Sequence, residues 1–161
     1  TGMVTARGQY RFMCDADLAM PLDQIERFLK EITNGCDIAI GSRELSDSKR
    51  FGEPMLRYFA GRVFNLFVKF VAIRKYQDTQ CGFKCFSSEA ADKIFPLVRT
   101  NGWAFDVEVL LLADRYGFSV SQVPIDWRHG KKSKVDLRSA ALQMIRDIFL
   151  TRVRLLMSHR K

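Results

Sequence analysis

The strongest candidate for chemistry in this sequence is a pair of aspartates separated by one residue. Asp15 and Asp17 directly follow a short apolar run at 10–14, and Pro21 then opens a helical pattern. Side chains two positions apart in an extended segment leave the same face, so both carboxylates can point into one site. Two close carboxylates favour a hard divalent cation, which commonly completes its shell with substrate phosphates. The alternative interpretation is a solvated turn that happens to contain two aspartates.

The elements around this pair have the pattern of an α/β fold. An apolar strand at 10–14, a helical pattern from 25 to 32 and a second strand at 37–40 form a strand–helix–strand unit, which is typical of parallel sheets. The segments 41–53 and 124–134 have the composition of polar loops. Further strands are expected before residue 86 and at 118–123, and further helices at 54–71, 88–95, 102–113 and 137–157. In such a sheet, ligands bind beyond the carboxyl ends of the strands, which is where Asp15 and Asp17 lie.

The helix expected at 54–71 is rich in apolar residues and has two interpretations. Its apolar residues recur every three or four positions: Leu56, Phe59, Val63, Phe64, Phe67, Phe70 and Val71. The first interpretation is a helix that faces the core. The other is an interfacial helix with some phenylalanines against lipid.

The positive charge of the chain is concentrated at its end. Of 161 residues, 26 are Lys or Arg and 18 are Asp or Glu, a formal net charge of +8. Residues 1–127 hold 16 of each sign and residues 128–161 hold 10 basic and 2 acidic residues, so the whole excess lies in the last segment. A basic amphipathic helix at 136–161 is expected to associate with an anionic membrane surface. Nucleic acid is disfavoured as a partner because the aromatic residues do not interleave with the basic run.

The remaining composition fits a folded domain in a reducing compartment. Hydrophobic residues make up 47% of the chain and 13 residues are Phe. The four cysteines form no Cys-x-x-Cys pair and lie in or beside apolar runs, which is typical of buried thiols. No run approaches the ~20 apolar residues that a spanning helix needs.

Six separate segments resemble one family. They are Phe12-Met-Cys-Asp-Ala-Asp-Leu18 after Ala6-Arg-Gly8, Ile40-Gly-Ser-Arg43, Asp78-Thr-Gln-Cys-Gly-Phe-Lys84, Trp103-Ala-Phe-Asp-Val-Glu108, Val123-Pro-Ile-Asp-Trp-Arg128 and Ser133-Lys134. Their order and spacing resemble family 2 glycosyltransferases, in the branch of the dolichyl-phosphate glucose and mannose synthases and their polyprenyl-phosphate relatives. The resemblance implies a GT-A fold, a Rossmann-like α/β fold with a mostly parallel sheet flanked by helices.

The resemblance also implies a role for each matching residue. Asp15 and Asp17 match the pair that holds Mg²⁺ or Mn²⁺ against the donor diphosphate. Positions expected to bind the acceptor phosphate are Ser42, Arg43, Arg57 and Arg128, and further membrane or phosphate contacts are expected from Lys131, Lys132 and Lys134. Asp78, Asp106 and Glu108 match the acceptor side and are the candidate catalytic residues. An anionic lipid phosphate hardly needs a general base, so Asp78 is expected to orient the acceptor or the donor sugar.

Compared with the family pattern, the nucleotide-binding N-terminal part is missing. We therefore expect residues 1–135 to form roughly the C-terminal two-thirds of a GT-A catalytic domain, followed by the basic helix at 136–161. Alone, such a chain is expected to be weakly active or inactive. It would also expose the strand Tyr10–Cys14 as an apolar sheet edge, which favours self-association.

The function implied is an inverting transfer of a hexose to dolichyl or polyprenyl phosphate at the cytoplasmic face of a membrane. UDP-glucose and GDP-mannose are both candidate donors, and glucose is favoured over mannose. An alternative is a transferase with a saccharide hydroxyl as acceptor, although its Gln-x-x-Arg-Trp segment is absent from the sequence. A non-enzymatic basic module that binds nucleic acid is the remaining alternative.

Overall fold

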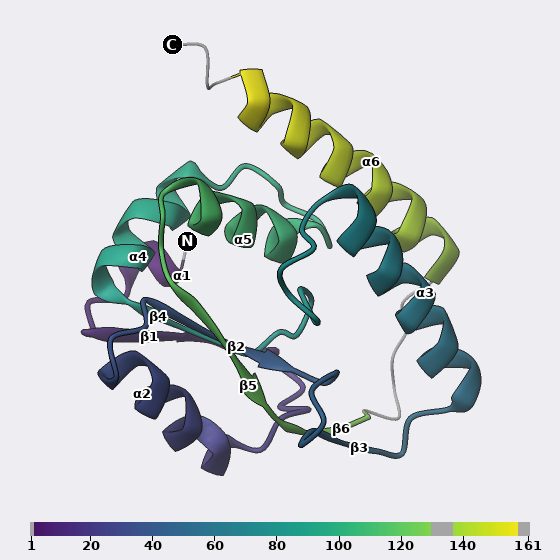
Figure 1. Ribbon diagram of the computed structural model, residues 1–161, viewed down its shortest axis with the longest axis horizontal. Coiled ribbons are helices and arrows are strands. Elements are labelled where there is room, and N and C mark those ends of the chain that lie inside the picture. The colour runs from purple at the N-terminus through teal and green to yellow at the C-terminus, as the bar shows by residue number, and fades with distance from the viewer. Residues whose placement is uncertain (1, 130–136, 158–161) are drawn as a thin grey trace.

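The computed structural model describes residues 2–129 and 137–157, without the side chains of residues 56, 57, 60, 64 and 137–141. The centre of the fold is a four-stranded sheet with the order β1-β4-β2-β5 (Figure 1). Its strands are β1 (Tyr10–Met13), β2 (Ile38–Ser42), β4 (Lys84–Ser87) and β5 (Val120–Pro124). β2 pairs parallel with β5, whereas β4 pairs antiparallel with β1 and with β2. Three strands therefore share one direction, and β4 separates the two that the strand–helix–strand pattern predicts.

The alternation of side chains along β2 gives the sheet two covered faces. Ile38 and Ile40 belong to one apolar cluster, and Ala39 belongs to the other, as the two-residue period of a strand requires. α2 (Ile25–Thr33) covers the face of Ala39 with Phe28, which is fully buried. In Figure 1, α4 and α5 lie on the opposite side of the sheet from α2. Because both faces are covered, the sheet acts as a rigid base for the loops at its ends.

The remaining helices follow the sequence patterns closely. Ser87 caps α4 by accepting a hydrogen bond from the backbone N–H of Ala90, as the sequence predicts for one of its two serines. Pro54 directly precedes the long helix α3, where the pattern predicts a helix start. The helices and turns are α1 (Gly2–Thr5), η1 (Leu22–Gln24), α3 (Met55–Val71), α4 (Ser88–Ile94), η2 (Phe95–Leu97), α5 (Phe105–Arg115) and α6 (Leu137–Met157).

Two short strands lie where the sequence predicts only loops. β3 (Lys49–Phe51) and β6 (Asp126–Arg128) form a parallel two-stranded ribbon with Arg50 opposite Trp127. Both strands are three residues long, polar and only partly buried, so neither carries an apolar alternation that the sequence would reveal. The prediction of loops was wrong here, because the pairing depends on two segments that are far apart in the chain.

α6 packs against the body of the protein. Met144 and Ile148 are buried in the same apolar cluster as Val68 and Ala72 at the end of α3. The Arg152 guanidinium donates to the carbonyl oxygens of Val71 and Ala72. The predicted boundary at residue 135 lies outside the described residues, but the helix that follows it shares the main core.

β1 lies at one end of the strand order, and β5 at the other. The sequence predicts an edge at Tyr10–Cys14, and β1 occupies Tyr10–Met13 with β4 as its neighbour in the described part of the chain. Self-association along this edge stays a prediction.

Candidate active site

The two aspartates lie in a tight turn directly beyond β1. The backbone N–H of Leu18 donates to the carbonyl oxygen of Asp15 at 3.2 Å, and that of Ala19 donates to the Asp17 carboxylate at 3.0 Å. Leu18 has a φ of 49°, in the left-handed region that is costly for a leucine, so the turn is held by its surroundings. Both carboxylates are exposed. The chain therefore presents two acids from one constrained turn.

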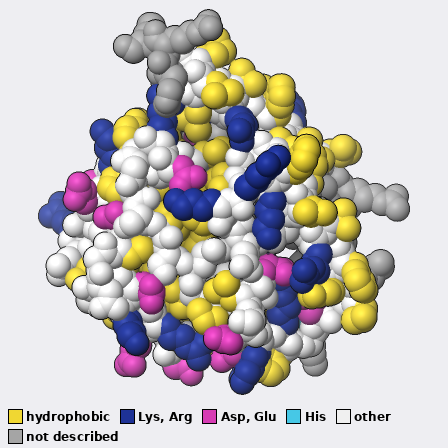
Figure 2. Space-filling model, viewed as in Figure 1, with side chains coloured by type: hydrophobic (Ala, Val, Ile, Leu, Met, Phe, Trp, Pro, Cys, Tyr) yellow, Lys and Arg dark blue, Asp and Glu magenta, His cyan; other side chains and the backbone are white. Residues whose placement is uncertain are grey.

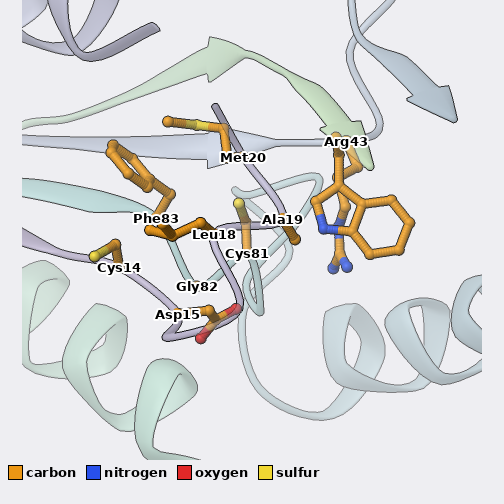
Figure 3. A pocket seen from close by; sticks show the side chains of 10 residues that line it. Cys14, Asp15, Leu18, Ala19, Met20, Arg43, Cys81, Gly82 and Phe83 are labelled. Carbon is orange, nitrogen blue, oxygen red and sulfur yellow. The ribbon is translucent and has the colours of Figure 1, made fainter. Parts of the chain in front are cut away.

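Gly82 allows the Asp15 carboxylate to lie against the neighbouring loop. A Cβ built on Gly82 would lie 2.0 Å from an Asp15 carboxylate oxygen, far inside any permitted contact. Figure 3 shows Asp15 beside Gly82 at one end of a small pocket, with Arg43 at the other end. The glycine in this loop thus fixes where the carboxylate of Asp15 can lie.

The charges around Asp15 favour a bound cation. Partial burial raises the pKa of the Asp15 carboxyl, and the neighbouring charges of Asp106 and Asp17 raise it further, while Lys84 and Arg43 oppose the shift. Several carboxylates that repel one another are stabilised by a positive ion. Among the described residues, no group of three or more His, Cys, Asp or Glu side chains could enclose a metal on its own. Two exposed carboxylates fit a hard divalent cation that takes its other ligands from water and a bound diphosphate.

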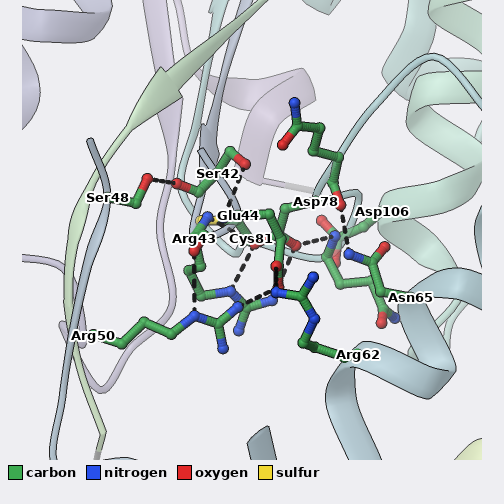
Figure 4. Close-up of polar contacts among 12 residues, drawn as sticks. Ser42, Arg43, Glu44, Ser48, Arg50, Arg62, Asn65, Asp78, Cys81 and Asp106 are labelled. Atoms are coloured by element: carbon green, nitrogen blue, oxygen red, sulfur yellow. Dashed lines mark hydrogen bonds and ion pairs between the residues drawn. The ribbon is translucent and has the colours of Figure 1, made fainter. Parts of the chain in front are cut away.

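Arg43 faces the acids from the end of β2 and is held by Asp78. The Asp78 carboxylate accepts from the Arg43 Nε at 2.7 Å, from its Nη2 at 3.0 Å and from its backbone N–H at 3.0 Å (Figure 4). Asp78 is 2% exposed, and the contacts with Arg43 hold the pKa of its carboxyl below the usual value despite burial. Asp78 thereby positions Arg43, and it also accepts from the backbone N–H of Gln80 at 3.2 Å.

The geometry leaves part of the Arg43 guanidinium free for a ligand. A guanidinium has five N–H donors, and the pair with Asp78 uses Nε and one N–H of Nη2. The guanidinium also lies 5.5 Å from the centroid of the Trp127 ring, which is supplied by the β3–β6 ribbon. Asp78 raises the pKa of Arg43, so the group stays charged. An arginine fixed on two sides with free donors is suited to bind phosphate.

Lys84 and Asp106 form a second fixed pair beside Asp15. The Lys84 ammonium is fully buried and donates to the Asp106 carboxylate at 2.6 Å and to the carbonyl oxygen of Cys81. Asp106 is in the first turn of α5 and its side chain is 20% exposed. The prediction placed Asp106 near the site, and its charge does act on Asp15.

Glu108 does not lie with Asp106. It is fully buried and accepts from the backbone N–H groups of Arg99 and Thr100, the latter at 2.7 Å, and from the Arg154 guanidinium of α6. Residues two positions apart on a helix point to different sides, so the helix separates the two acids that the sequence places together. The structure does not bring Glu108 beside Asp106, and its catalytic role stays a prediction; its contacts fix α6 and the 99–100 segment.

The expected phosphate-binding residues have different environments. Ser42 is fully buried, and its hydroxyl accepts from the backbone N–H of Glu44, so its contact with phosphate stays a prediction. Arg128 is exposed and lies 5.9 Å from the Phe51 ring. The side chain of Arg57 and all of Lys131, Lys132 and Lys134 lie outside the described residues.

Three residues of the site had no role in the sequence prediction: Gly82, Lys84 and Trp127. A lysine at the start of an otherwise apolar strand, Lys84-Cys-Phe, is a signal that could have been read, since a buried lysine needs an acidic partner. The role of Trp127 depends on the ribbon that the sequence did not reveal.

The family of this chain follows from its similarity to known proteins. Residues 1–95 match the family model "Glycosyl transferase family 2". The chain therefore belongs to glycosyltransferase family 2.

Curated relatives agree with this assignment. The chain is 36% identical to a dolichyl-phosphate beta-glucosyltransferase from Dictyostelium discoideum over 97% of this chain and 50% of that protein. It is 34% identical to the enzyme of that name from Saccharomyces cerevisiae over 94% of this chain and 49% of that protein. The chain thus spans about half the length of the curated relatives it matches.

Solved structures show the same fold at low sequence identity. Glucosyl-3-phosphoglycerate synthase from Mycobacterium tuberculosis with phosphoglyceric acid superposes with a TM-score of 0.69 at 15% identity, over 93% of this chain and 52% of that one. The same synthase with Mn²⁺ and UDP-glucose gives a TM-score of 0.62 at 14% identity, over 94% and 51%. The GT-A fold predicted from the sequence is confirmed.

Proposed function

We propose that this chain provides the cation-binding and acceptor-binding part of an inverting transferase that moves glucose from UDP-glucose to dolichyl or polyprenyl phosphate. The observation that carries the proposal is one pocket lined by the carboxylate of Asp15 and the fixed guanidinium of Arg43, with Asp17 exposed in the same turn as Asp15. The dolichyl-phosphate beta-glucosyltransferases among the relatives support glucose and the lipid acceptor.

Asp15 and Asp17 are the residues that would hold Mg²⁺ or Mn²⁺. The cation would offset the negative charge that develops on the leaving nucleoside diphosphate. Mn²⁺ with UDP-glucose in a structural neighbour supports this choice of cation and donor. Gly82 leaves room for the Asp15 carboxylate, and Lys84 holds the Asp106 carboxylate in an ion pair.

The acceptor phosphate would bind opposite the cation. Arg43 offers its free N–H donors and Arg128 is exposed at the ribbon. A lipid phosphate is anionic near neutral pH and attacks without losing a proton, so no general base is required. The buried and fully engaged Asp78 fits that chemistry, because its task is to hold Arg43.

The outer face of α3 supports binding at a membrane surface. Five large apolar side chains spaced three or four residues apart are more than half exposed; they are Met55, Phe59, Val63, Leu66 and Phe70, and we call them the α3 stripe. Figure 2 shows apolar side chains gathered over the rim formed by α3 and α6, beside basic side chains. Such a stripe next to cations is typical of an interfacial helix. Of the two interpretations of this helix, the stripe favours the lipid-facing one.

α6 contributes to this surface in a different way from the one the sequence predicts. Its outer side chains Leu142, Phe149 and Leu156 are exposed, while Arg152 donates to backbone carbonyl oxygens at the end of α3 and Arg154 pairs with the buried Glu108. These two arginines therefore also stabilise the packing of α6 on the protein. In the described part of the chain, no helix is both long enough and apolar enough to cross a bilayer.

The proposal is tested with a chimaera. The segment of the Saccharomyces cerevisiae relative that aligns with this chain is replaced by this chain, and the protein is incubated with labelled UDP-glucose or GDP-mannose, dolichyl phosphate and Mn²⁺. Label that passes into the organic phase with UDP-glucose, and that is lost in Asp15→Asn, supports the proposal. Transfer of mannose, or label confined to water-soluble saccharide, contradicts it.

A further inference from the structure

We infer that Arg62 is a further binding residue for the lipid phosphate, held in place by Glu44 and Tyr58. This inference rests on the proposed function and adds to it a residue that the sequence motifs do not mark. Arg62 lies on α3, where its side chain is 53% exposed.

Glu44 and Tyr58 hold the guanidinium of Arg62 in one position. Its Nη1 donates to the Glu44 carboxylate at 2.9 Å and to the Tyr58 hydroxyl at 3.0 Å, and the guanidinium lies 5.5 Å from the centroid of the Tyr58 ring. Exposed arginines usually lose much rotamer freedom when they bind a ligand. Arg62 has already lost it, although half of its surface is open to a ligand.

Glu44, which binds Arg62, is itself held by a second arginine. Glu44 is only 10% exposed and also binds the Arg50 guanidinium, which in turn donates to the carbonyl oxygen of Arg43 at 3.2 Å. Figure 4 shows Arg43, Arg50 and Arg62 gathered around this carboxylate. Glu44 therefore links the position of Arg62 to the position of Arg43, and the two arginines are held by one network.

The two arginines bound to Glu44 differ in the N–H donors that they keep for a ligand. Arg50 is surrounded by Glu44, Glu53 and the Arg43 carbonyl and uses all three of its nitrogens. Toward the described residues Arg62 uses only Nη1, which leaves its Nε and Nη2 donors for a ligand. Of these two arginines, Arg62 is the one that can still donate to a phosphate.

Arg62 lies on α3 between the apolar α3 stripe and the segment that contains Asp78. On the helix, Arg62 lies three residues after Phe59 and directly before Val63, both in the exposed α3 stripe. On its other side Asn65 donates to the carbonyl oxygen of Gln77, next to the Asp78 that holds Arg43. A lipid whose chain lies along the α3 stripe would thus place its phosphate between Arg62 and Arg43, where two fixed guanidinium groups can share it.

The experiment uses this chain and measures the Kd for farnesyl phosphate in phosphatidylcholine vesicles. We expect Arg62→Gln to raise the Kd about tenfold, because one charge-assisted contact is lost. Farnesol, which lacks the phosphate, should bind equally well to both proteins. Glu44→Gln should raise the Kd for farnesyl phosphate by about threefold, since Arg62 stays charged but is less well held.

Arg74→Gln is the matched control. Arg74 is also exposed, and it lies 5.4 Å from the ring of Phe70 at the far end of the same stripe. Its Kd for farnesyl phosphate should change by less than about twofold. An equal loss in Arg62→Gln and Arg74→Gln, or a loss that appears only after phosphatidylserine is added, would show bulk attraction to anionic lipid and overturn the inference.

Two other outcomes separate the inference from the proposed function. If the unsubstituted chain binds farnesyl phosphate and Arg62→Gln binds it equally well, the inference fails and the proposed acceptor stands. If the unsubstituted chain binds farnesyl phosphate no better than farnesol, the proposed acceptor is wrong and the role of Arg62 falls with it. Circular dichroism and thermal unfolding of each variant show that the binding changes do not arise from unfolding.

Discussion

α2 and α3 carry apolar residues at the same helical spacing but use them for opposite purposes. α2 buries Phe28 and Ile32 against the sheet, where Phe28 contacts Phe83 with ring centroids 5.0 Å apart. α3 buries Val68 near its end, while Phe59 and Phe70 are 56% and 75% exposed. An amphipathic pattern therefore reports that a helix has an apolar face, and not whether protein or another phase covers that face.

The largest effect should come from the buried face of α2. Phe28→Ala removes a fully buried ring and should lower the free energy of unfolding by about 3–5 kcal/mol. Phe59→Ala on α3 should change it by less than about 0.5 kcal/mol, because its ring already faces outward. Urea denaturation of the two variants measures the contrast. Similar losses in both would mean that α3 is covered by protein.

Asp78 is buried in the interior and pairs with Arg43 of the candidate site. Asp78→Asn should lower the free energy of unfolding by about 1–3 kcal/mol at pH 7, because the pair with Arg43 is lost.

The stabilising contribution of Asp78 should depend on pH. The carboxyl pKa of Asp78 is lower in the folded protein than its ordinary value of 3.8, so its stabilising contribution is present above that pH and is lost as the pH falls below it. Denaturation between pH 7 and pH 3 should therefore show a flatter acid decline in Asp78→Asn than in the unsubstituted protein. A parallel decline in the two would contradict the ion pair.

The exposed apolar stripe of α3 is tested by its binding to lipid vesicles. Phe59→Ser combined with Phe70→Ser should reduce partitioning onto phosphatidylcholine vesicles by about tenfold or more, because two large side chains no longer enter the interface. Leu22→Ser is the control, since Leu22 is 49% exposed but lies on η1 outside the stripe. Co-sedimentation measures both, and equal loss from the control would show that exposure alone, and not the stripe, determines binding.

A substitution at Gly82 should change stability little but should lower the affinity for a cation. Gly82→Ala places a Cβ where the Asp15 carboxylate lies, and the flexible carboxylate can move away at a cost of less than about 1 kcal/mol. The affinity for Mn²⁺ should fall about threefold or more, because the two acids no longer share one position. Gly61→Ala has open space around its Cβ and should change neither quantity. Calorimetry with Mn²⁺ distinguishes the two variants.

The sequence predicts the elements with a strong period and misses those without one. α3 begins after Pro54 as expected, and Asp15 and Asp17 are exposed beyond the first strand, because apolar runs and helix breakers are local signals. β3 and β6 are short and polar, so the ribbon that brings Trp127 to Arg43 was missed.

Two residues expected in the site are buried in the fold for a common reason. Ser42 and Glu108 carry the right chemistry in the right segments, but burial directs Ser42 into the fold and the helix turns Glu108 toward Arg154. Spacing along a chain shows which residues share an element, and only packing decides which way each side chain points. Likewise, the net charge of the C-terminal segment could not show that Arg152 is used to bind the end of α3.

Mn²⁺ added to the isotopically labelled chain, in the presence of pyrophosphate, tests the cation site most directly. Paramagnetic broadening of amide signals should be strongest at the turn that holds the two acids and at the adjacent Gly82, and should weaken with distance from them. The broadening should vanish in Asp15→Asn. Broadening centred elsewhere, or unchanged in that variant, would contradict the account.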